Sequence, residues 1–504
     1  METVPALLRR FAIRWGAHPD PRKHPAASLP IETLPLPRRL YIPLRQHLGA
    51  PATALVRVGQ QVRKGELIGR SAGEVSAPVH ATTSGRITAL CDVVAPHPSG
   101  LTAPAITLEA DGNDEWLPRD GPGDPFALPP AAIAAQVRDA GIVGMGGATF
   151  PSAVKLQLAR QREVARLILN GGECEPYLSC DDRLMRERAD AVVDGARILR
   201  HATSAREVLI GIEDNKPEAL AAMRRAAQPF GEVTIHRVPS RYPMGSEKQL
   251  VHTLLGTEVP AGARPADVGV LVHNVATAYA VHRALRFGEP LVRRIVTVNG
   301  GAVAAPRNLE VPIGTPVREL FAYCGGFIEE PARLVIGGPM MGQQLATVDA
   351  PVVKGASGVL ALTRAEIAQP DAAPCIRCAT CVTACPMGLM PLEIASYVRA
   401  GDLDHAAAYG LGDCMGCGCC AYLCPAHIPL VQYFAYAKGE IAARERNQAK
   451  QAALQQLAIA REERLARVAR EKAEAAARRK AAKLAAAAAT PASGEPSARH
   501  ERQR

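Results

Sequence analysis

The sequence has no run of about 18 apolar residues without charge, so we expect no membrane-spanning helix. Its first 20 residues contain no apolar core of the signal-peptide type, and a cleaved export signal is not expected. Apolar residues make up 48% of the 504 residues, which is ordinary for a chain that buries cores and excludes disorder for most of its length. A chain of this length is expected to form about three to five compact units.

Basic residues exceed acidic ones, 59 to 49, and the excess is concentrated at the end of the chain. Residues 441–504 carry 15 Lys and Arg against 7 Asp and Glu. Alanine and charged residues with few helix breakers predict one long polar helix over 441–489, with too few apolar positions for a coiled coil. A solvated helix is the plainest interpretation. Contact with a partner subunit or anionic lipid headgroups is the alternative, and no base-reading module favours nucleic acid.

Thirteen cysteines require an explanation, because nine of them lie between Cys375 and Cys424. A disulfide-stapled domain is usually short and secreted, and this chain is neither on the criteria above. Clustered cysteines therefore indicate metal or redox chemistry. Two runs share one spacing: Cys375-x2-Cys378-x2-Cys381-x3-Cys385-Pro386 and Cys414-x2-Cys417-x2-Cys420-x3-Cys424-Pro425. Structural zinc also uses four cysteines, but its sites pair two CxxC units and need neither the third cysteine nor the Cys-Pro.

The repeated spacing is that of bacterial two-cluster ferredoxins, in which the fourth cysteine of each run ligates the other cluster. Three thiolates at three-residue intervals can wrap a loop around one cluster, whereas the fourth points away from it. We therefore expect two 4Fe–4S clusters. The first set of ligands is Cys375, Cys378, Cys381 and Cys424, and the second set is Cys414, Cys417, Cys420 and Cys385. Cys419 is expected to be a spare thiol, although an exchange with Cys420 stays open. Helix-like sequences between the runs predict a helical ferredoxin domain.

A glycine-rich loop, Gly144-Met-Gly146-Gly147-Ala-Thr-Phe150-Pro151, runs into a predicted helix over Ser152–Arg162. Glycines let backbone N–H groups approach a phosphate closely, and a helix N-terminus favours an anion. Lys155, one turn inside the helix, could reach the same anion. The loop lacks the Gly-Lys-Ser/Thr of a Walker A motif. On its own it is either a ligand loop or a tight turn beside a solvated lysine.

The loop resembles the FMN-binding loop of the flavoprotein subunit of respiratory complex I, and three further segments resemble that family in order. They are Asn170-Gly-Gly-Glu173-Cys-Glu175-Pro176, Tyr242-Pro-Met-Gly245-Ser246-Glu247 and His273-Asn274-Val-Ala-Thr277. The resemblance implies an FMN site. Its expected residues are Gly144, Gly146, Gly147, Phe150, Lys155, Asn170, Glu173, Glu175, Gly245, Glu247, Asn274 and Thr277. No protein side chain is expected to act as a catalytic group, because the chemistry is carried by the flavin.

Three departures from that family pattern weaken the case for direct NADH binding. The family's aspartate is Gly172, its first glutamate of Gly-Glu-Glu is Ser246, and its first asparagine of Asn-Asn is His273. Glu173 and Glu175 could still accept bonds from ribose hydroxyls, or they could be solvated loop carboxylates. FMN binding survives these changes if the loop backbone, Lys155 and the two asparagines hold it.

Short alternating runs between glycines near the N-terminus predict a small β domain. The segment resembles the barrel-sandwich hybrid fold of lipoyl and biotinyl carrier domains, but its turn, 77–85, has no lysine for cofactor attachment. We therefore expect a docking or structural role. After the small β domain, alternating strands and helices predict a wound α/β sheet. Residues 295–338 resemble the β-grasp module called SLBB.

The whole arrangement resembles the family of the C subunit of Rnf/Rsx electron-transport complexes. The expected fold is multidomain α/β plus small β modules. The expected divisions are an irregular lead-in (1–30), barrel-sandwich hybrid (31–113), linker (114–130), FMN/NADH-binding α/β domain (131–285), SLBB module (286–350), two-cluster ferredoxin domain (365–435) and basic helical tail (436–504).

This resemblance implies a translocase or oxidoreductase subunit that is peripheral on the cytoplasmic side of the inner membrane. It implies electron exchange between NAD(H) or ferredoxin and sister membrane and iron–sulfur subunits, coupled to ion movement, and in some relatives a redox regulator that is kept reduced. Two alternatives remain. One is a cluster-bearing scaffold without flavin that docks ferredoxin or sister subunits. The other is an NADH dehydrogenase independent of membranes.

Overall fold

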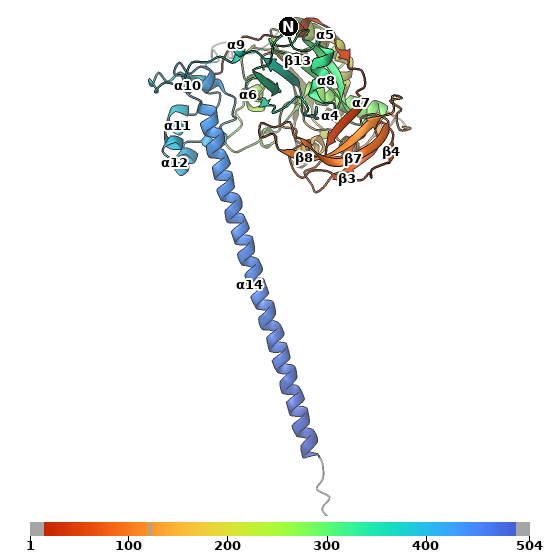
Figure 1. Ribbon diagram of the computed structural model, residues 1–504, viewed down its shortest axis with the longest axis vertical. Helices are drawn as coiled ribbons and strands as arrows, with labels where there is room; N and C mark the ends of the chain where they lie inside the picture. The colour runs from red at the N-terminus through yellow and green to blue at the C-terminus, as the bar shows by residue number, and fades with distance from the viewer. Residues whose placement is uncertain (1–14, 120–122, 490–504) are drawn as a thin grey trace, which may run out of the picture. The chain divides into compact units, whose positions relative to one another are not determined.

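A computed structural model describes residues 15–119 and 123–489 (Figure 1). Predictions that fall on residues 1–14, 120–122 and 490–504 lie outside these ranges. The chain divides after Phe434 into two compact units. Within the described ranges, no helix combines the length and the apolar character needed to cross a membrane.

The first β module contains two antiparallel sheets, drawn in red to orange in Figure 1. One sheet, in the order β2-β8-β7-β4, is formed by β2 (Arg39–Pro43), β4 (Gln61–Val62), β7 (Gly85–Val94) and β8 (Thr102–Ala110). The other, in the order β3-β5-β6, is formed by β3 (Thr53–Ala54), β5 (Leu67–Arg70) and β6 (Val79–His80). Alternate residues point inward, so Leu40 and Ile42 of β2 are fully buried. The predicted barrel-sandwich hybrid is confirmed.

The turn that carries the cofactor in carrier domains is buried here. Every residue from 77 to 85 is buried. The Lys354 amino group, on a residue that is 1% exposed, donates to the carbonyls of Pro78 and Gly141, both at 2.7 Å. The turn is therefore packed against the α/β region and against a residue beyond the SLBB segment, which agrees with the structural role expected from its missing lysine.

The α/β region has a four-stranded parallel sheet in the order β11-β10-β9-β12. Its strands are β9 (Arg166–Gly171), β10 (Glu207–Glu213), β11 (Val233–Val238) and β12 (Val270–Asn274). Residues of β9 are buried on both faces: Leu167 and Leu169 pack into one core, and Ile168 packs into another. Such continuous apolar runs are typical of parallel strands covered on both sides. The chain adds β10 and β11 on one side of β9 and β12 on the other, so the direction of strand addition reverses between β9 and β12.

Seven helices accompany this sheet in the described residues. They are α1 (Pro130–Asp139), α2 (Ser152–Gln161), α3 (Cys180–Glu187), α4 (Ala189–Thr203), α5 (Pro217–Ala227), α6 (Glu247–Leu255) and α7 (Val275–Phe287). Helices α4 and α7 approach closely, since a Cβ at Gly195 would lie only 1.9 Å from the Ala278 carbonyl oxygen. Helices α3 and α4 are separated by a break at Arg188, whose backbone is not helical (φ −134°) and whose guanidinium bonds Glu310 and Tyr279.

The β-grasp sheet has the order β1-β14-β13-β17-β15-β16. Its elements are β1 (Glu32–Thr33), β13 (Arg293–Asn299), β14 (Arg307–Pro312), β15 (Arg333–Ile336), β16 (Gln343–Gln344) and β17 (Gly358–Leu362), with helix α8 (Val317–Tyr323). Strands β1 and β17 come from outside the predicted 286–350 segment. The sheet is therefore completed by residues from two other parts of the chain.

The cysteine-rich region is helical, as predicted. Its helices are α9 (Arg364–Ile367), α10 (Thr380–Ala384), α11 (Pro391–Arg399), α12 (Leu403–Ala408) and α13 (Cys419–Tyr422), and all residues from 363 to 429 are described and contain no strand. Helix α14 (Leu430–Ala488) follows. Its first residues belong to the first unit, and the remainder, from Ala435, forms the second unit. The predicted long polar helix is thus present, and its side chains are exposed from residue 444 onward.

Candidate cofactor sites

The glycine-rich loop is a closed turn at the start of α2. The Gly144 N–H donates to the Phe150 carbonyl at 2.8 Å, and Gly147 has φ +122°, a conformation that favours glycine. The Met145 N–H donates to the Thr277 hydroxyl at 3.0 Å and so ties the loop to α7. Residues 146–148 are exposed. The loop therefore presents open backbone beside two helix N-termini, where an anion is favoured.

The carboxyl ends of β9 and β12 carry the two predicted asparagines. The Asn170 amide donates to the Gly245 carbonyl at 2.7 Å, and its oxygen accepts from the Gly172 N–H at 2.9 Å. Asn274 caps α7 by accepting from the Ala276 N–H at 2.8 Å. These strand ends flank the point where strand addition reverses, which is where ligands bind in open α/β sheets.

Lys155 lies next to the same sheet edge. Its ammonium donates to the Glu247 carboxylate at 2.5 Å and to the Val272 carbonyl at 3.1 Å. The Lys155 side chain is 23% exposed and that of Glu247 is 45% exposed. The structure therefore pairs two of the predicted site residues with each other, and both side chains remain accessible to solvent.

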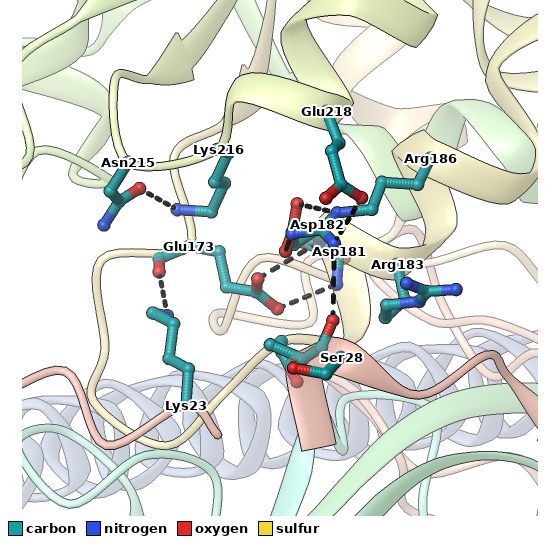
Figure 2. A network of polar contacts seen from close by, with 12 residues as sticks. Lys23, Ser28, Glu173, Asp181, Asp182, Arg183, Arg186, Asn215, Lys216 and Glu218 are labelled. Atoms are coloured by element: carbon teal, nitrogen blue, oxygen red, sulfur yellow. Dashed lines mark hydrogen bonds and ion pairs between the residues drawn. The ribbon is translucent and has the colours of Figure 1, made fainter. Parts of the chain in front are cut away.

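Two lysines hold the segment that follows β9, and Figure 2 shows the bond from Lys23 to the Glu173 carbonyl. Lys23 donates to the carbonyls of Glu173 at 2.8 Å, Glu175 at 3.0 Å and Leu178 at 2.5 Å. Lys216, 2% exposed, donates to the Gly172 carbonyl at 2.7 Å and to the Glu213 carboxylate at 2.6 Å. Neither lysine lies in a motif, so neither was predicted from the sequence.

The two predicted loop carboxylates accept backbone hydrogen bonds. Glu173 accepts from the N–H groups of Asp181 at 2.7 Å and Asp182 at 3.1 Å, at the N-terminus of α3 (Figure 2). Glu175 accepts from the N–H groups of Met340 at 3.0 Å and Met341 at 2.8 Å. Burial raises the pKa of Glu175 to about 7 against the lowering effect of these bonds. Both carboxylates thus shape the loop, and a ribose hydroxyl would have to compete for them.

Asp181 is a further acidic residue at this edge. Its carboxylate accepts from the Asn274 amide at 2.6 Å. Burial, followed by the negative charge of Glu173, raises the pKa of Asp181 to about 7. No sequence motif marked this residue, although it is the one that connects α3 to the cap of α7.

The site contains buried polar atoms without a protein partner. His273 is 3% exposed and neither ring nitrogen has a hydrogen-bond partner among the described residues. Burial lowers the pKa of His273 to about 3, so the ring is neutral. The Ser152 hydroxyl at the start of α2 is also buried without a partner there. Unsatisfied buried polar groups are costly, and their presence beside the glycine loop fits a polar cofactor such as FMN.

The four cysteines of the second set line one cavity. Cys385, Cys414, Cys417 and Cys420 all contribute to its wall, and the rest of the lining is largely apolar. Burial, together with the nearby thiols of the other three cysteines, raises the pKa of Cys420 to about 12. Four cysteines that line one cavity in a largely apolar setting fit a 4Fe–4S cluster, whose ligands are cysteine thiolates.

The first set lies in a more open position. Cys375 and Cys378 are exposed. The Cys381 thiol is close enough to Cys424 and Cys378 for their charges to contribute to its raised pKa, after the larger effect of burial. Cys424, from the second run, is therefore next to a cysteine of the first run. The structure therefore brings Cys378, Cys381 and Cys424 of this set close together. Cys375 and Cys378 face solvent.

Cys419 lies outside both sets. It is fully buried, is absent from the wall of the cysteine cavity, and its thiol donates to the Tyr242 carbonyl at 3.7 Å. It does not line the cavity with the second set, and its role as a spare thiol stays a prediction.

Comparison with protein families finds four matches along the chain. Residues 11–113 match the RnfC barrel sandwich hybrid domain, and residues 137–283 match the Nuo51 FMN-binding domain. Residues 295–344 match the SLBB domain, and residues 374–428 match the 4Fe-4S dicluster domain. The chain therefore carries domains for FMN and for two 4Fe–4S clusters.

Curated relatives match most of the chain. The C subunit of an ion-translocating oxidoreductase complex from Rhodobacter capsulatus is 51% identical over 87% of this chain and 85% of its own length. The C subunit of a proton-translocating ferredoxin:NAD(+) oxidoreductase complex from Clostridium ljungdahlii is 44% identical over 88% of this chain and 97% of its own length. The C subunit of an ion-translocating oxidoreductase complex from Haemophilus influenzae is 43% identical over 85% of this chain and 64% of its own length. The similarity thus extends well beyond the cofactor motifs.

Proposed function

The chain belongs to the family of C subunits of ion-translocating oxidoreductase complexes, and we propose that it transfers electrons between NAD(H) and partner subunits through FMN and two 4Fe–4S clusters. The observation that carries this proposal is the presence of both cofactor domains in one compact unit. When bound, FMN exchanges electron pairs with a nicotinamide and single electrons with iron–sulfur centres.

The chain's own residues hold and orient these groups. We assign the FMN phosphate end to the exposed backbone of residues 146–148 in the glycine loop and to Lys155, with Asn170 and Asn274 at the strand ends. The first set and the second set of cysteines ligate one cluster each. Lys23 and Lys216 keep the segment after β9 in place by binding its carbonyls.

The partners follow from the family. We propose that the chain binds sister membrane and iron–sulfur subunits and lies peripherally at the cytoplasmic face of the inner membrane. Two features support this placement. The described residues offer no helix suited to crossing a membrane, and helix α14, exposed from residue 444 onward, carries an excess of basic residues that anionic lipid headgroups attract.

Anaerobic purification with iron, sulfide and flavin analysis tests the proposal. We expect about eight irons and one FMN per chain, and we expect NADH to bleach the flavin absorbance in a stopped-flow mixing experiment. Eight irons without flavin would support the scaffold alternative, and two zinc ions in place of iron would refute electron transfer. Sedimentation with washed membranes that contain the sister subunits distinguishes the peripheral subunit from a membrane-independent dehydrogenase.

A further inference from the structure

The α/β region and the cysteine-rich region meet at Tyr242. This tyrosine is 2% exposed and exchanges two backbone hydrogen bonds with Ala17, at 2.9 and 3.0 Å, which fix its backbone. Its phenol donates to the carbonyl of Cys417 at 2.6 Å. A side chain of the predicted flavin-binding motif therefore binds the backbone of a predicted cluster ligand.

A second contact runs parallel to the first. Gln249 of α6 is 7% exposed, and its amide nitrogen donates to the Pro386 carbonyl at 2.7 Å. The Ser246 hydroxyl donates to the Gln249 amide oxygen at 2.9 Å and thereby orients the amide. Pro386 follows Cys385 directly, so this bond also acts on a predicted ligand of the second set.

Both contacts reach the second set and neither reaches the first. Cys417 and Cys385 come from different cysteine runs, 32 residues apart in the sequence, yet both line the same cavity. The thiols of Cys375 and Cys378 accept bonds from the nearby Arg377 N–H and Thr380 hydroxyl, and both cysteines are exposed. The second set thus faces the α/β region, and the first set is the one with two exposed members.

We propose that Tyr242 and Gln249 are positioning residues that hold the second-set cluster against the flavin domain and tune its reduction potential. This inference rests on the proposed function. The phenol polarises the Cys417 peptide group, because hydrogen bonds in a chain strengthen one another. Hydrogen bonds around the ligands of a cluster help to set its potential, and donors stabilise the more negative, reduced state. The exposed first set is then the one that a protein electron partner can approach.

The test is an EPR-monitored redox titration of Tyr242→Phe and Gln249→Met, purified anaerobically as the full chain. Cys420→Ser identifies which signal belongs to the second set, because it removes a ligand of that cluster only. Tyr323→Phe is the matched control, since its phenol donates to Glu32 in the β-grasp sheet. Iron and FMN contents are measured for every variant.

We expect both variants to lower the reduced-to-oxidised ratio of the second-set cluster at a fixed potential by about three- to tenfold, the range for one hydrogen bond. For a one-electron couple this corresponds to about 28 to 59 mV. The first-set signal and the control should not move. Loss of about four irons from Tyr242→Phe, with FMN retained, would also support positioning.

Three results would overturn the inference: no shift in either variant, equal shifts of both signals, or shifts of different signals in the two variants. The last result would also refute the assignment of Cys385 and Cys417 to one cluster. If Tyr242→Phe fails to fold, Gln249→Met decides alone. Failure of the proposed function is recognised separately, because the parent protein would then lack FMN or have fewer than eight irons.

Discussion

Replacement of Lys155 by methionine should weaken FMN binding, because it removes the ammonium that α2, the helix directly after the glycine loop, places against the Val272 carbonyl of β12. The ammonium contacts the Glu247 carboxylate at 2.5 Å and the Val272 carbonyl at 3.1 Å. Methionine keeps a side chain of similar length and deletes the charge. The Glu247 carboxylate would then remain next to the anionic cofactor without the charge that neutralises it.

The size of the effect follows from the exposure of the pair. A hydrogen bond to a charged group contributes about 1.5–3 kcal/mol, or about 10- to 150-fold in affinity. Lys155 is 23% exposed and Glu247 is 45% exposed, so solvent screens their charges and the lower part of the range applies. We expect the dissociation constant of FMN to rise about 10- to 30-fold.

Titration of the flavin-free protein with FMN, followed by quenching of flavin fluorescence, measures this constant. Lys248→Met is the matched control, because the Lys248 ammonium donates to the Pro260 carbonyl and the residue belongs to no predicted motif. The double variant Lys155→Met with Glu247→Gln separates two roles. If Lys155 only neutralises Glu247, the double variant should recover parental affinity. Equal FMN affinity in Lys155→Met and the parent would refute the assignment altogether.

Three further predictions concern the clusters, the buried lysine and the tail. Cys420→Ser should reduce the iron content from about eight towards four per chain, whereas Cys419→Ser should leave it unchanged, as iron analysis will show. Burial lowers the pKa of Lys354 to about 7 from its ordinary 10.5. The unfolded chain therefore binds more protons between these values, and stability should rise with pH across this window by up to about 5 kcal/mol. Thermal midpoints of the parent and Lys354→Met at pH 7 and pH 9.5 should diverge in favour of the parent, and parallel profiles would contradict this. Truncation after residue 440 should retain FMN and iron, because the first compact unit ends at Phe434.

The cysteine sets show what local spacing can predict. Ligands within one run are only three residues apart, so their grouping is encoded in a short loop. Even the crossing of Cys385 to the other run could be expected, and the structure places it with Cys414, Cys417 and Cys420 around one cavity. The ligand assignment itself stays a prediction until a cluster is analysed. The α/β sheet could likewise be predicted from the sequence, because buried parallel strands have continuous apolar runs.

Contacts between residues that are remote in sequence could not be predicted in this way, because they leave no recognisable spacing in the sequence. Lys23 lies in a segment that was predicted as an irregular lead-in, yet it binds three carbonyls about 150 residues away. Strand β1 consists of two residues near position 32 that pair with β14 near position 309. The break at Arg188 depends on Glu310 and Tyr279, which are remote in sequence. A lone lysine or a two-residue strand carries no periodicity, so only the folded chain identifies these partners.

Lysines that donate to backbone carbonyls are a shared means of joining the modules. Lys354 joins the barrel turn to the α/β region, Lys216 joins β10 to the segment after β9, and Lys23 joins the N-terminal lead-in to that same segment. A buried amino group is stabilised only when all its partners are in place, because an unpaired buried polar or charged group is costly. The flavin-site segment can therefore reach its final conformation only together with the docking of the N-terminal lead-in and of β10. The cofactor loop and the modules around it should consequently order together, rather than the loop closing on a completed scaffold.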